Sequence, residues 1–172
     1  MSAAKTAGKL FLRSYQPGDF EALYQIDQSC YPPGIAYSRR MLKWYLGLPG
    51  AECVVAEHDA ALVGFVLTAR DAAQGHVITL DVLLEHRRRG IGSALLAEAE
   101  LRLCDAGVRQ VTLETATDNR PAVAFWHKHG YRTRGILKGY YLGRVDAYWM
   151  EKFLAAVPGR SGSPAAERNR AV

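Results

Sequence analysis

The sequence lacks the features of membrane-spanning and disulfide-rich proteins. Its 172 residues contain no run of 18 consecutive apolar residues, so we expect no membrane-spanning segment and no membrane partner. Residues 1–9 lack the apolar stretch of a signal peptide, so a cytoplasmic location is the default expectation. The three cysteines, Cys30, Cys53 and Cys104, are an odd number without metal-ligand spacing, which favours reduced thiols over disulfides.

The interior of the chain has little net positive charge, although the formal net charge of the whole chain is +5. Residues 1–9 and residues 158–172 each carry +2, which leaves about +1 for residues 10–157. The basic composition is therefore weak evidence for a nucleic-acid surface, and we expect no nucleic-acid partner. The last segment is rich in Pro, Gly, Ser and charge, so we expect disordered tails at 1–8 and 158–172 around one domain, 9–157.

Strand and helix signals alternate along the interior, which predicts a mixed α/β sheet. Their order indicates an antiparallel first half, a strand–helix–strand crossover and an antiparallel end. Ser38 is expected to cap a helix that ends near Gly47, and Gly107 and Gly130 are expected to end two later helices. The predicted strands are 9–15, 51–57, 62–70, 76–84, 108–115, 131–140 and 145–153, and the predicted helices are 17–29, 38–47, 90–106 and 119–129.

The most informative segment is 87–92, where three arginines lead into a Gly-x-Gly pair between a predicted strand and a helix. The first turn of a helix has unpaired N–H groups and a partial positive charge, and glycines let a phosphate approach that backbone. Arginines beside the turn add charge-assisted hydrogen bonds, so the segment predicts a diphosphate cradle. The alternative is a helix start with a solvated basic turn. No Lys follows the glycines as in a P-loop, and Leu95 stands where a Rossmann fingerprint needs a third Gly or Ala.

This segment resembles the signature of the GNAT acetyltransferase superfamily, Arg/Gln-x-x-Gly-x-Gly/Ala between the fourth strand and the third helix. The resemblance covers roughly residues 9–153. It implies a GNAT fold with a mixed central sheet of about seven strands and about four helices, splayed between the fourth and fifth strands. It also implies acetyl-CoA as co-substrate, without a metal. The residues implied to bind it are Leu80 and Val82 toward the pantetheine arm, and Arg87, Arg88, Arg89, Gly90, Ile91, Gly92 and Ser93 toward the pyrophosphate.

A second block, 119–131, looks like the family's Asn-x-x-Ala-x-x-Leu/Phe-Tyr-x-x-x-Gly-Phe. The resemblance implies that Asn119 binds the pantetheine arm, whereas an ordinary helix N-cap is the other interpretation. In the similar ribosomal-protein-alanine N-acetyltransferases, the Tyr of this pattern protonates the departing thiolate. This chain has Trp126 there, and an indole N–H does not give up its proton. Either Tyr140 or Tyr141 takes over that role, or the thiolate leaves unassisted.

Glu114 is the candidate general base. Strand alternation places Thr112 and Glu114 on the face opposite Val111 and Leu113, and a carboxylate on a central strand is costly unless it faces a cleft. The corresponding Glu is the base in the ribosomal-protein-alanine group that the chain resembles. In this superfamily a backbone N–H of the fourth strand meets the thioester carbonyl, which makes Val82 the candidate. A solvent-facing Glu near a strand end is the alternative for Glu114.

The protonation of amines favours an α-amine as acceptor. With a pKa near 7.8, roughly one α-amine in seven is neutral at pH 7, against about one lysine side chain in 2,500. In this fold the segments 30–37 and 139–144 would flank the acceptor, and their tyrosines either bind it or pack the loops against the sheet. Asp81 either meets a cationic amine or forms structural hydrogen bonds. The candidate acceptor-binding residues are Tyr31, Tyr37, Asp81 and Tyr140.

Three functions follow from these residues. The first is an N-acetyltransferase for a protein or peptide N-terminus, and the second is an acetyltransferase for a small amine such as a polyamine or aminoglycoside. The third is a non-catalytic acetyl-CoA sensor. This alternative stays open because Trp126 stands where the similar enzymes have their general acid. A monomer and a homodimer are both compatible with the sequence. His127 and His129 lie on different faces of a helix, and the other histidines, His58, His76 and His86, are expected to be isolated surface residues.

Overall fold

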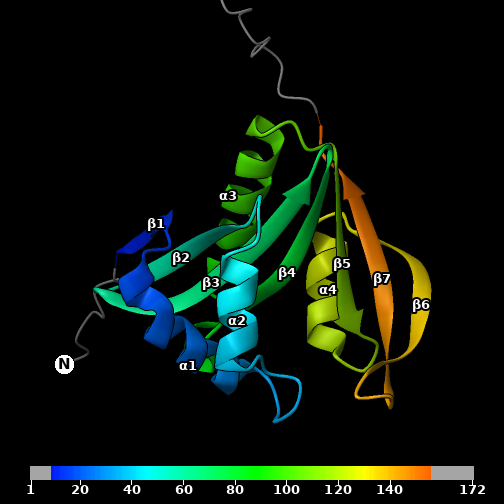
Figure 1. Ribbon diagram of the computed structural model, residues 1–172, viewed down its shortest axis with the longest axis horizontal. Helices are drawn as coiled ribbons and strands as arrows, with labels where there is room; N and C mark the ends of the chain where they lie inside the picture. Colours follow the sequence, from blue (N-terminus) through cyan, green and yellow to red (C-terminus); the bar gives the residue numbers. More distant parts are fainter. Residues whose placement is uncertain (1–8, 156–172) are drawn as a thin grey trace, which may run out of the picture.

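Seven strands form one sheet in the computed structural model, which describes residues 9–155 (Figure 1). The α-helices are α1 (Phe20–Cys30), α2 (Arg39–Leu46), α3 (Ile91–Asp105) and α4 (Arg120–Lys128), and Pro17–Asp19 and Leu84–His86 form 3₁₀ turns. The strands are β1 (Leu10–Ser14), β2 (Glu52–His58), β3 (Ala61–Asp71), β4 (Gln74–Val82), β5 (Gln110–Ala116), β6 (Arg132–Tyr141) and β7 (Val145–Phe153). The predicted tails, 1–8 and 158–172, lie outside the described residues.

The strand order is β1-β2-β3-β4-β5-β7-β6, and every neighbouring pair is antiparallel except β4 and β5. The helix α3 makes the crossover between these two parallel strands. The mixed α/β fold class and its antiparallel–crossover–antiparallel arrangement are therefore confirmed. No helix in the range 9–155 is long and apolar enough to cross a membrane.

The residues predicted to begin or end three of the helices have the expected capping geometry. The hydroxyl of Ser38 accepts a hydrogen bond from the N–H of Met41 (3.2 Å), which caps α2. Gly107 and Gly130 follow α3 and α4 with φ angles of +90° and +87°, in the left-handed region that glycine enters without a steric penalty.

The fourth strand is shorter at its C-terminal end than its apolar pattern predicts. The sequence predicts a strand to Leu84, whereas β4 ends at Val82. The N–H of Leu83 still donates to the carbonyl of Val63 (2.9 Å), and the chain then turns away, so the side chain of Leu84 is 75% exposed. The turn brings the three arginines of 87–89 back toward the start of α3.

The sheet opens between β4 and β5. These strands pair over only three residue pairs, from Gln74–Gln110 to His76–Thr112. A bulge in β4 at Ile78, where the register with β3 shifts, follows directly. Bulges bend a strand and increase its twist, so β4 diverges from β5 beyond His76. The predicted splay between the fourth and fifth strands is thus present.

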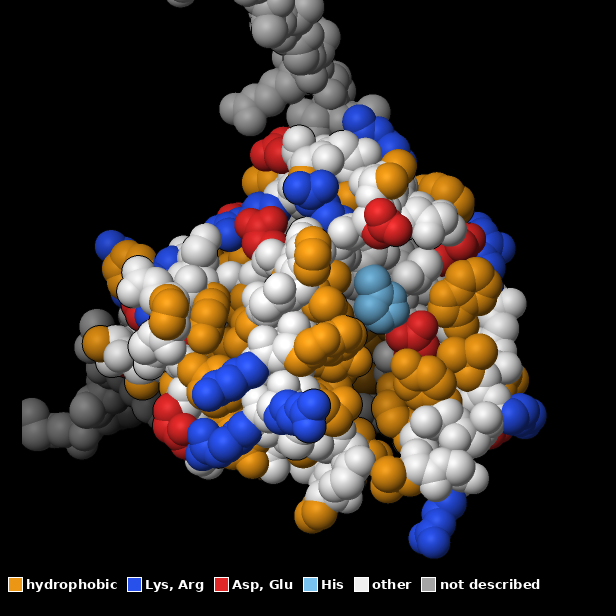
Figure 2. Space-filling view, viewed as in Figure 1, with side chains coloured by type: hydrophobic (Ala, Val, Ile, Leu, Met, Phe, Trp, Pro, Cys, Tyr) orange, Lys and Arg blue, Asp and Glu red, His pale blue; other side chains and the backbone are white. Residues whose placement is uncertain are grey.

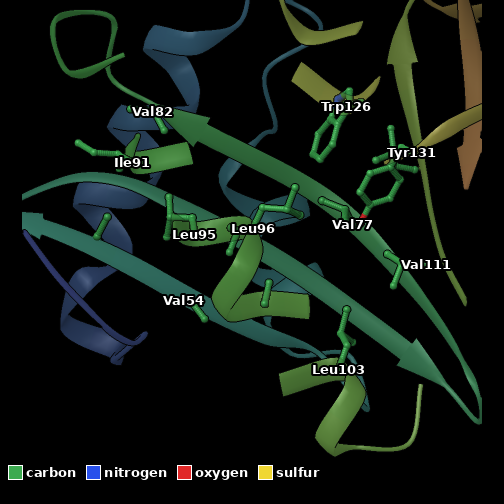
Figure 3. Close-up of a cluster of buried hydrophobic side chains, with 14 of the residues drawn as sticks. Val54, Val77, Val82, Ile91, Leu95, Leu96, Leu103, Val111, Trp126 and Tyr131 are labelled. Carbon is green, nitrogen blue, oxygen red and sulfur yellow. The ribbon is translucent and has the colours of Figure 1, made fainter. Parts of the chain in front are cut away.

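Each face of the sheet is covered by its own pair of helices. On one face, α3 and α4 enclose a core that includes Leu95, Leu96, Trp126 and Tyr131 (Figure 3). On the other, α1 and α2 cover a second core around Phe65 and neighbouring aliphatic side chains. The first core packs against both β4 and β5, whereas the second reaches β4 through Ile78.

Candidate active site

The N-terminus of α3 has the geometry of an anion cradle. Gly90 caps the helix with φ +83°, and Arg88 precedes it with φ +60°. A Cβ on Gly90 would meet no atom within 4 Å, so glycine is required there for its backbone conformation and not for space. A Cβ on Gly92 would lie 3.5 Å from the ring of Phe125, an ordinary contact, which fits a Gly/Ala position.

Arg87 anchors this turn to the sheet. Its Nε donates to the carbonyl of Val82 at 2.8 Å, which ties the basic turn to the end of β4. Arg88 and Arg89 are exposed beside the start of α3. The guanidinium of Arg87 thus orients the cradle, while two further arginines remain available to an anion.

Ser93 and Asn119 both make contacts within the protein. The hydroxyl of Ser93, in the first turn of α3, lies 2.9 Å from Nε2 of His129 at the end of α4. Burial lowers the pKa of His129, which favours the neutral imidazole. Asn119 caps α4, since its Oδ1 accepts from the N–H of Ala122 (3.2 Å). The N-cap interpretation of Asn119 therefore applies, and its amide NH₂ group remains available for a ligand.

We expect Gly90→Val to weaken coenzyme A binding about tenfold or more. A β-branched residue at this positive φ is strained by at least ~1 kcal/mol, and the turn would relieve the strain by moving the N–H groups of the cradle. Isothermal titration with coenzyme A measures the change. Gly92→Ala is the matched control and should bind within about twofold of the wild type. Equal affinity of the Gly90→Val protein would show that this turn does not hold the ligand.

The edge of β4 that faces the opening offers unpaired backbone groups. The N–H of Leu83 points toward β3, and successive strand residues direct their N–H groups to opposite sides. Leu80 and Val82 therefore direct their N–H groups toward β5, where the strands have separated. The carbonyl of Val82 is occupied by Arg87, which leaves its N–H as the group that can meet an oxyanion.

A histidine and a glutamate bridge the opening. Nε2 of His76 on β4 lies 3.1 Å from Oε2 of Glu114 on β5, and both side chains are partly exposed. Nδ1 of His76 lies 3.0 Å from the hydroxyl of Thr112, which is also 3.4 Å from the carbonyl of Gly75. The prediction that His76 is an isolated surface residue is therefore wrong. Its contacts with the Thr112 hydroxyl and with Oε2 of Glu114 hold the carboxylate in place.

Tyr140 and Tyr141 stand on the opposite side of Glu114. The Tyr141 hydroxyl donates to the main-chain carbonyl of Glu114 at a long 3.5 Å. The two tyrosine rings are edge-on with centroids 5.0 Å apart, and Tyr140 is 50% exposed. Burial, with the nearby Glu114 charge, raises the pKa of both phenols. Both hydroxyls therefore remain protonated at neutral pH and can donate hydrogen bonds.

The α1–α2 segment forms the other wall, and buried carboxylates fix it. The Tyr31 hydroxyl lies 3.1 Å from the hydroxyl of Thr79, which donates to Oδ1 of Asp81 (2.8 Å). Asp81 is 1% exposed and its Oδ2 has no hydrogen-bond partner among the described residues, so burial raises its pKa to about 7. The structure places Asp81 beneath this wall and not on its surface.

Tyr37 is held from two sides. Its hydroxyl donates to the carbonyl of Ile78 (3.3 Å), and its N–H donates to Oδ2 of Asp27 (2.8 Å). Asp27 is fully buried near the end of α1, and burial raises its pKa to about 6. Sequence reasoning missed Asp27, because an acidic residue in an amphipathic helix is ordinarily a surface residue.

A hollow separates these two walls on the face shown in Figure 2, with hydrophobic side chains on both flanks and a histidine beside an acidic side chain at one end. The ring of Tyr45 packs 5.1 Å from that of Tyr37, which extends the aromatic lining onto α2. The hollow therefore has aromatic side chains in its walls, contributed by the α1–α2 segment and by the end of β6.

Trp126 occupies the core and not the hollow. It is 8% exposed and packs edge-on against Tyr131 with centroids 5.3 Å apart (Figure 3). Its indole N–H makes no hydrogen bond within 9–155, yet it is not among the buried polar atoms without a partner. The N–H therefore keeps some solvent contact on the α4 side of the sheet. Among residues 9–155, no group of three or more His, Cys, Asp or Glu side chains is placed to hold a metal ion.

Known proteins share this architecture. The model of the acetyltransferase (GNAT) family matches residues 20–131. An N-alpha-acetyltransferase of Saccharolobus solfataricus is 30% identical over 167 residues, covering 87% of this chain and 97% of that protein. The structure of the Escherichia coli ribosomal-protein-S18-alanine N-acetyltransferase has a TM-score of 0.78 and 22% identity, covering 90% of this chain and 99% of that one. Arabidopsis thaliana NAA60 in complex with acetyl-CoA has a TM-score of 0.75 and 23% identity, covering 85% and 99%.

Proposed function

The chain belongs to the acetyltransferase (GNAT) family and is an acetyl-CoA-dependent N-acetyltransferase, and we propose that its acceptor is the N-terminal α-amine of a protein or peptide. One observation carries the proposal: the Glu114 carboxylate, held by His76 at 3.1 Å, lies at the opening of the sheet between two aromatic walls. Relatives named N-alpha-acetyltransferase support the same acceptor class.

The proposed reaction is a direct attack of the amine on the thioester. Glu114 takes a proton from the incoming ammonium, the amine nitrogen bonds to the carbonyl carbon, and the N–H of Val82 donates to the developing oxyanion. The nitrogen then releases its second proton to water as the C–S bond breaks, and the thiolate leaves with the electron pair and takes a proton from Tyr141. An α-amine suits a single carboxylate base, because roughly one in seven is already neutral at pH 7.

His76 has a positioning role in this scheme. Its imidazole holds one oxygen of Glu114, and the hydroxyl of Thr112 in turn holds the imidazole. A fixed carboxylate keeps its second oxygen aimed at the acceptor, which reduces the cost of reaching the attack geometry.

Substitutions of the two neighbouring tyrosines are expected to change different kinetic parameters. We assign Tyr141 to protonation of the thiolate, so Tyr141→Phe should lower kcat about tenfold, a modest effect because a thiol of pKa about 8.5 is a fair leaving group. We assign Tyr140 to acceptor binding, so Tyr140→Phe should raise KM for the acceptor about tenfold at unchanged kcat. Steady-state kinetics at saturating acetyl-CoA separate the two. An unchanged kcat for Tyr141→Phe would mean that the thiolate leaves unassisted.

Mass spectrometry on a mixed pool of short peptides and small amines, incubated with the protein and acetyl-CoA, tests the acceptor class. Acetylated peptide α-amines are the expected result. Acetylated polyamines or aminoglycosides, with unmodified peptides, would show that the acceptor is a small amine and would overturn the proposed peptide acceptor. Acetyl-CoA binding measured by titration, without any acetylated product, would favour a sensor and overturn the proposed reaction.

A further inference from the structure

The outer face of α2 combines exposed apolar and basic side chains. Leu42 points into the core and is fully buried, whereas Trp44 is 59% exposed and Met41 is 48% exposed. With Arg40 and Lys43, these two side chains line a shallow cavity of about 500 Å³. An exposed tryptophan in such a setting is characteristic of a binding surface, because indole combines a large apolar area with a polar N–H group.

The charge of this face is positive and largely uncompensated. The helix α2 contains three basic residues and no acidic one. Arg39 is paired with Glu21 through two hydrogen bonds of 2.6 and 2.8 Å. Arg40 has no ion pair within the described range 9–155, and the ammonium of Lys43 lies only over the ring of Phe20, 4.9 Å from its centroid. The cavity therefore attracts carboxylates.

An aromatic series connects this face with the acceptor walls. The ring of Trp44 lies 4.9 Å from that of Tyr45, and Tyr45 lies 5.1 Å from Tyr37. A peptide whose N-terminus reaches Glu114 advances by about 3.3 Å per residue when extended, so its third to fifth residues lie about 7–13 Å from its first residue. That distance is comparable to the length of the aromatic series.

We propose that Arg40, Lys43 and Trp44 bind the third to fifth residues of the acceptor and favour acidic side chains there. The inference rests on the proposed function and specifies its substrate class. The carboxylates would meet the two cations, and the indole face would cover the peptide between them. The chain's own segment 158–172 is a poor occupant, because it carries a charge of +2.

A peptide series tests this surface. The peptides share their first two residues and carry three glutamates, three alanines or three lysines at positions three to five. We expect kcat/KM to be about tenfold higher for the glutamate peptide than for the lysine peptide at 50 mM salt, with a smaller ratio at 500 mM because salt screens exposed charges. Lys43→Glu should invert the preference. The matched control, Arg132→Glu on the edge strand β6, should keep it.

The outcomes separate this inference from the proposed function. Equal kcat/KM for all three peptides would overturn the role of α2 and leave the N-terminal acceptor intact. Absence of acetylation in every peptide, while coenzyme A binds, would overturn both. Binding of the wild-type protein to vesicles rich in phosphatidylserine, lost in Lys43→Glu and without any charge preference among peptides, would assign the surface to a membrane and overturn the peptide inference.

Discussion

Glu114→Gln is expected to lower kcat for acetyl transfer by about 10²- to 10⁴-fold, the usual contribution of a positioned general base. Glutamine retains the shape of the side chain and can still accept a hydrogen bond from His76, but it cannot take a proton from the acceptor ammonium. The phosphate cradle at Gly90 lies on another element, so the Kd for coenzyme A should stay within about twofold. The effect should therefore appear in turnover and not in coenzyme binding.

Single-turnover assays with a peptide acceptor, alongside titration with coenzyme A, measure both quantities. His76→Ala is the informative companion, because alanine has no hydrogen-bonding side chain, so the variant removes the support of the carboxylate and keeps the base. It should lower kcat by less than Glu114→Gln does, and the double variant should be no slower than Glu114→Gln alone. If Glu114→Gln retains wild-type kcat, Glu114 is not the base, and the hydrogen bond to His76 is purely structural.

Asp81→Asn is expected to remove most of the dependence of stability on pH between about 5 and 8. Burial raises the pKa of Asp81 to about 7 in the folded protein, against about 3.9 in an unfolded chain. The folded state therefore binds this proton more tightly. The stabilisation is complete below pH 4 and is lost as the pH rises through 7. A shift of about three pKa units corresponds to a loss on the order of 4 kcal/mol at alkaline pH.

Thermal unfolding followed by circular dichroism from pH 5 to pH 8.5 measures this effect. The wild-type Tm should fall across the range, while the Tm of Asp81→Asn should stay nearly constant and exceed the wild-type value at pH 8. Asp27 contributes a smaller loss in the same direction, since burial raises its pKa to about 6.

Asp146→Asn provides the opposite control. Lys138 lowers the pKa of Asp146, so its contribution to stability is lost only in acid, below the range of the experiment. A wild-type pH slope in Asp81→Asn would show that Asp81 is already ionised in the folded protein across this range, so that burial does not raise its pKa.

The elements and the start of α3 at Gly90 were predictable because their signals are local. The arginines and glycines of 87–92 lie within one turn of a helix start, and the Ser38 cap contacts a residue three positions away. The alternation of Thr112 and Glu114 with buried Val111 and Leu113 is likewise a property of one strand.

The partner of Glu114 could not be predicted in this way. His76 and Glu114 meet because β4 and β5 pair in parallel with His76 opposite Thr112, and no hairpin turn sets that register. The bulge at Ile78 also changes which β4 side chains share a face, so Thr79 and Asp81 both lie under α1. Long-range pairing, unlike residue chemistry, leaves little local trace in the sequence.

The short seam of three residue pairs between β4 and β5 has a consequence for the lifetime of the folded chain. Beyond His76 the two halves of the sheet share no backbone hydrogen bonds within residues 9–155. An amide-bearing pantetheine arm lying along Leu80 and Val82 would act as an additional strand. Binding would then raise the free energy of unfolding by about 2.7 kcal/mol when the free ligand exceeds its Kd a hundredfold. The resistance of the protein to unfolding and proteolysis would therefore rise and fall with the supply of its own acyl donor.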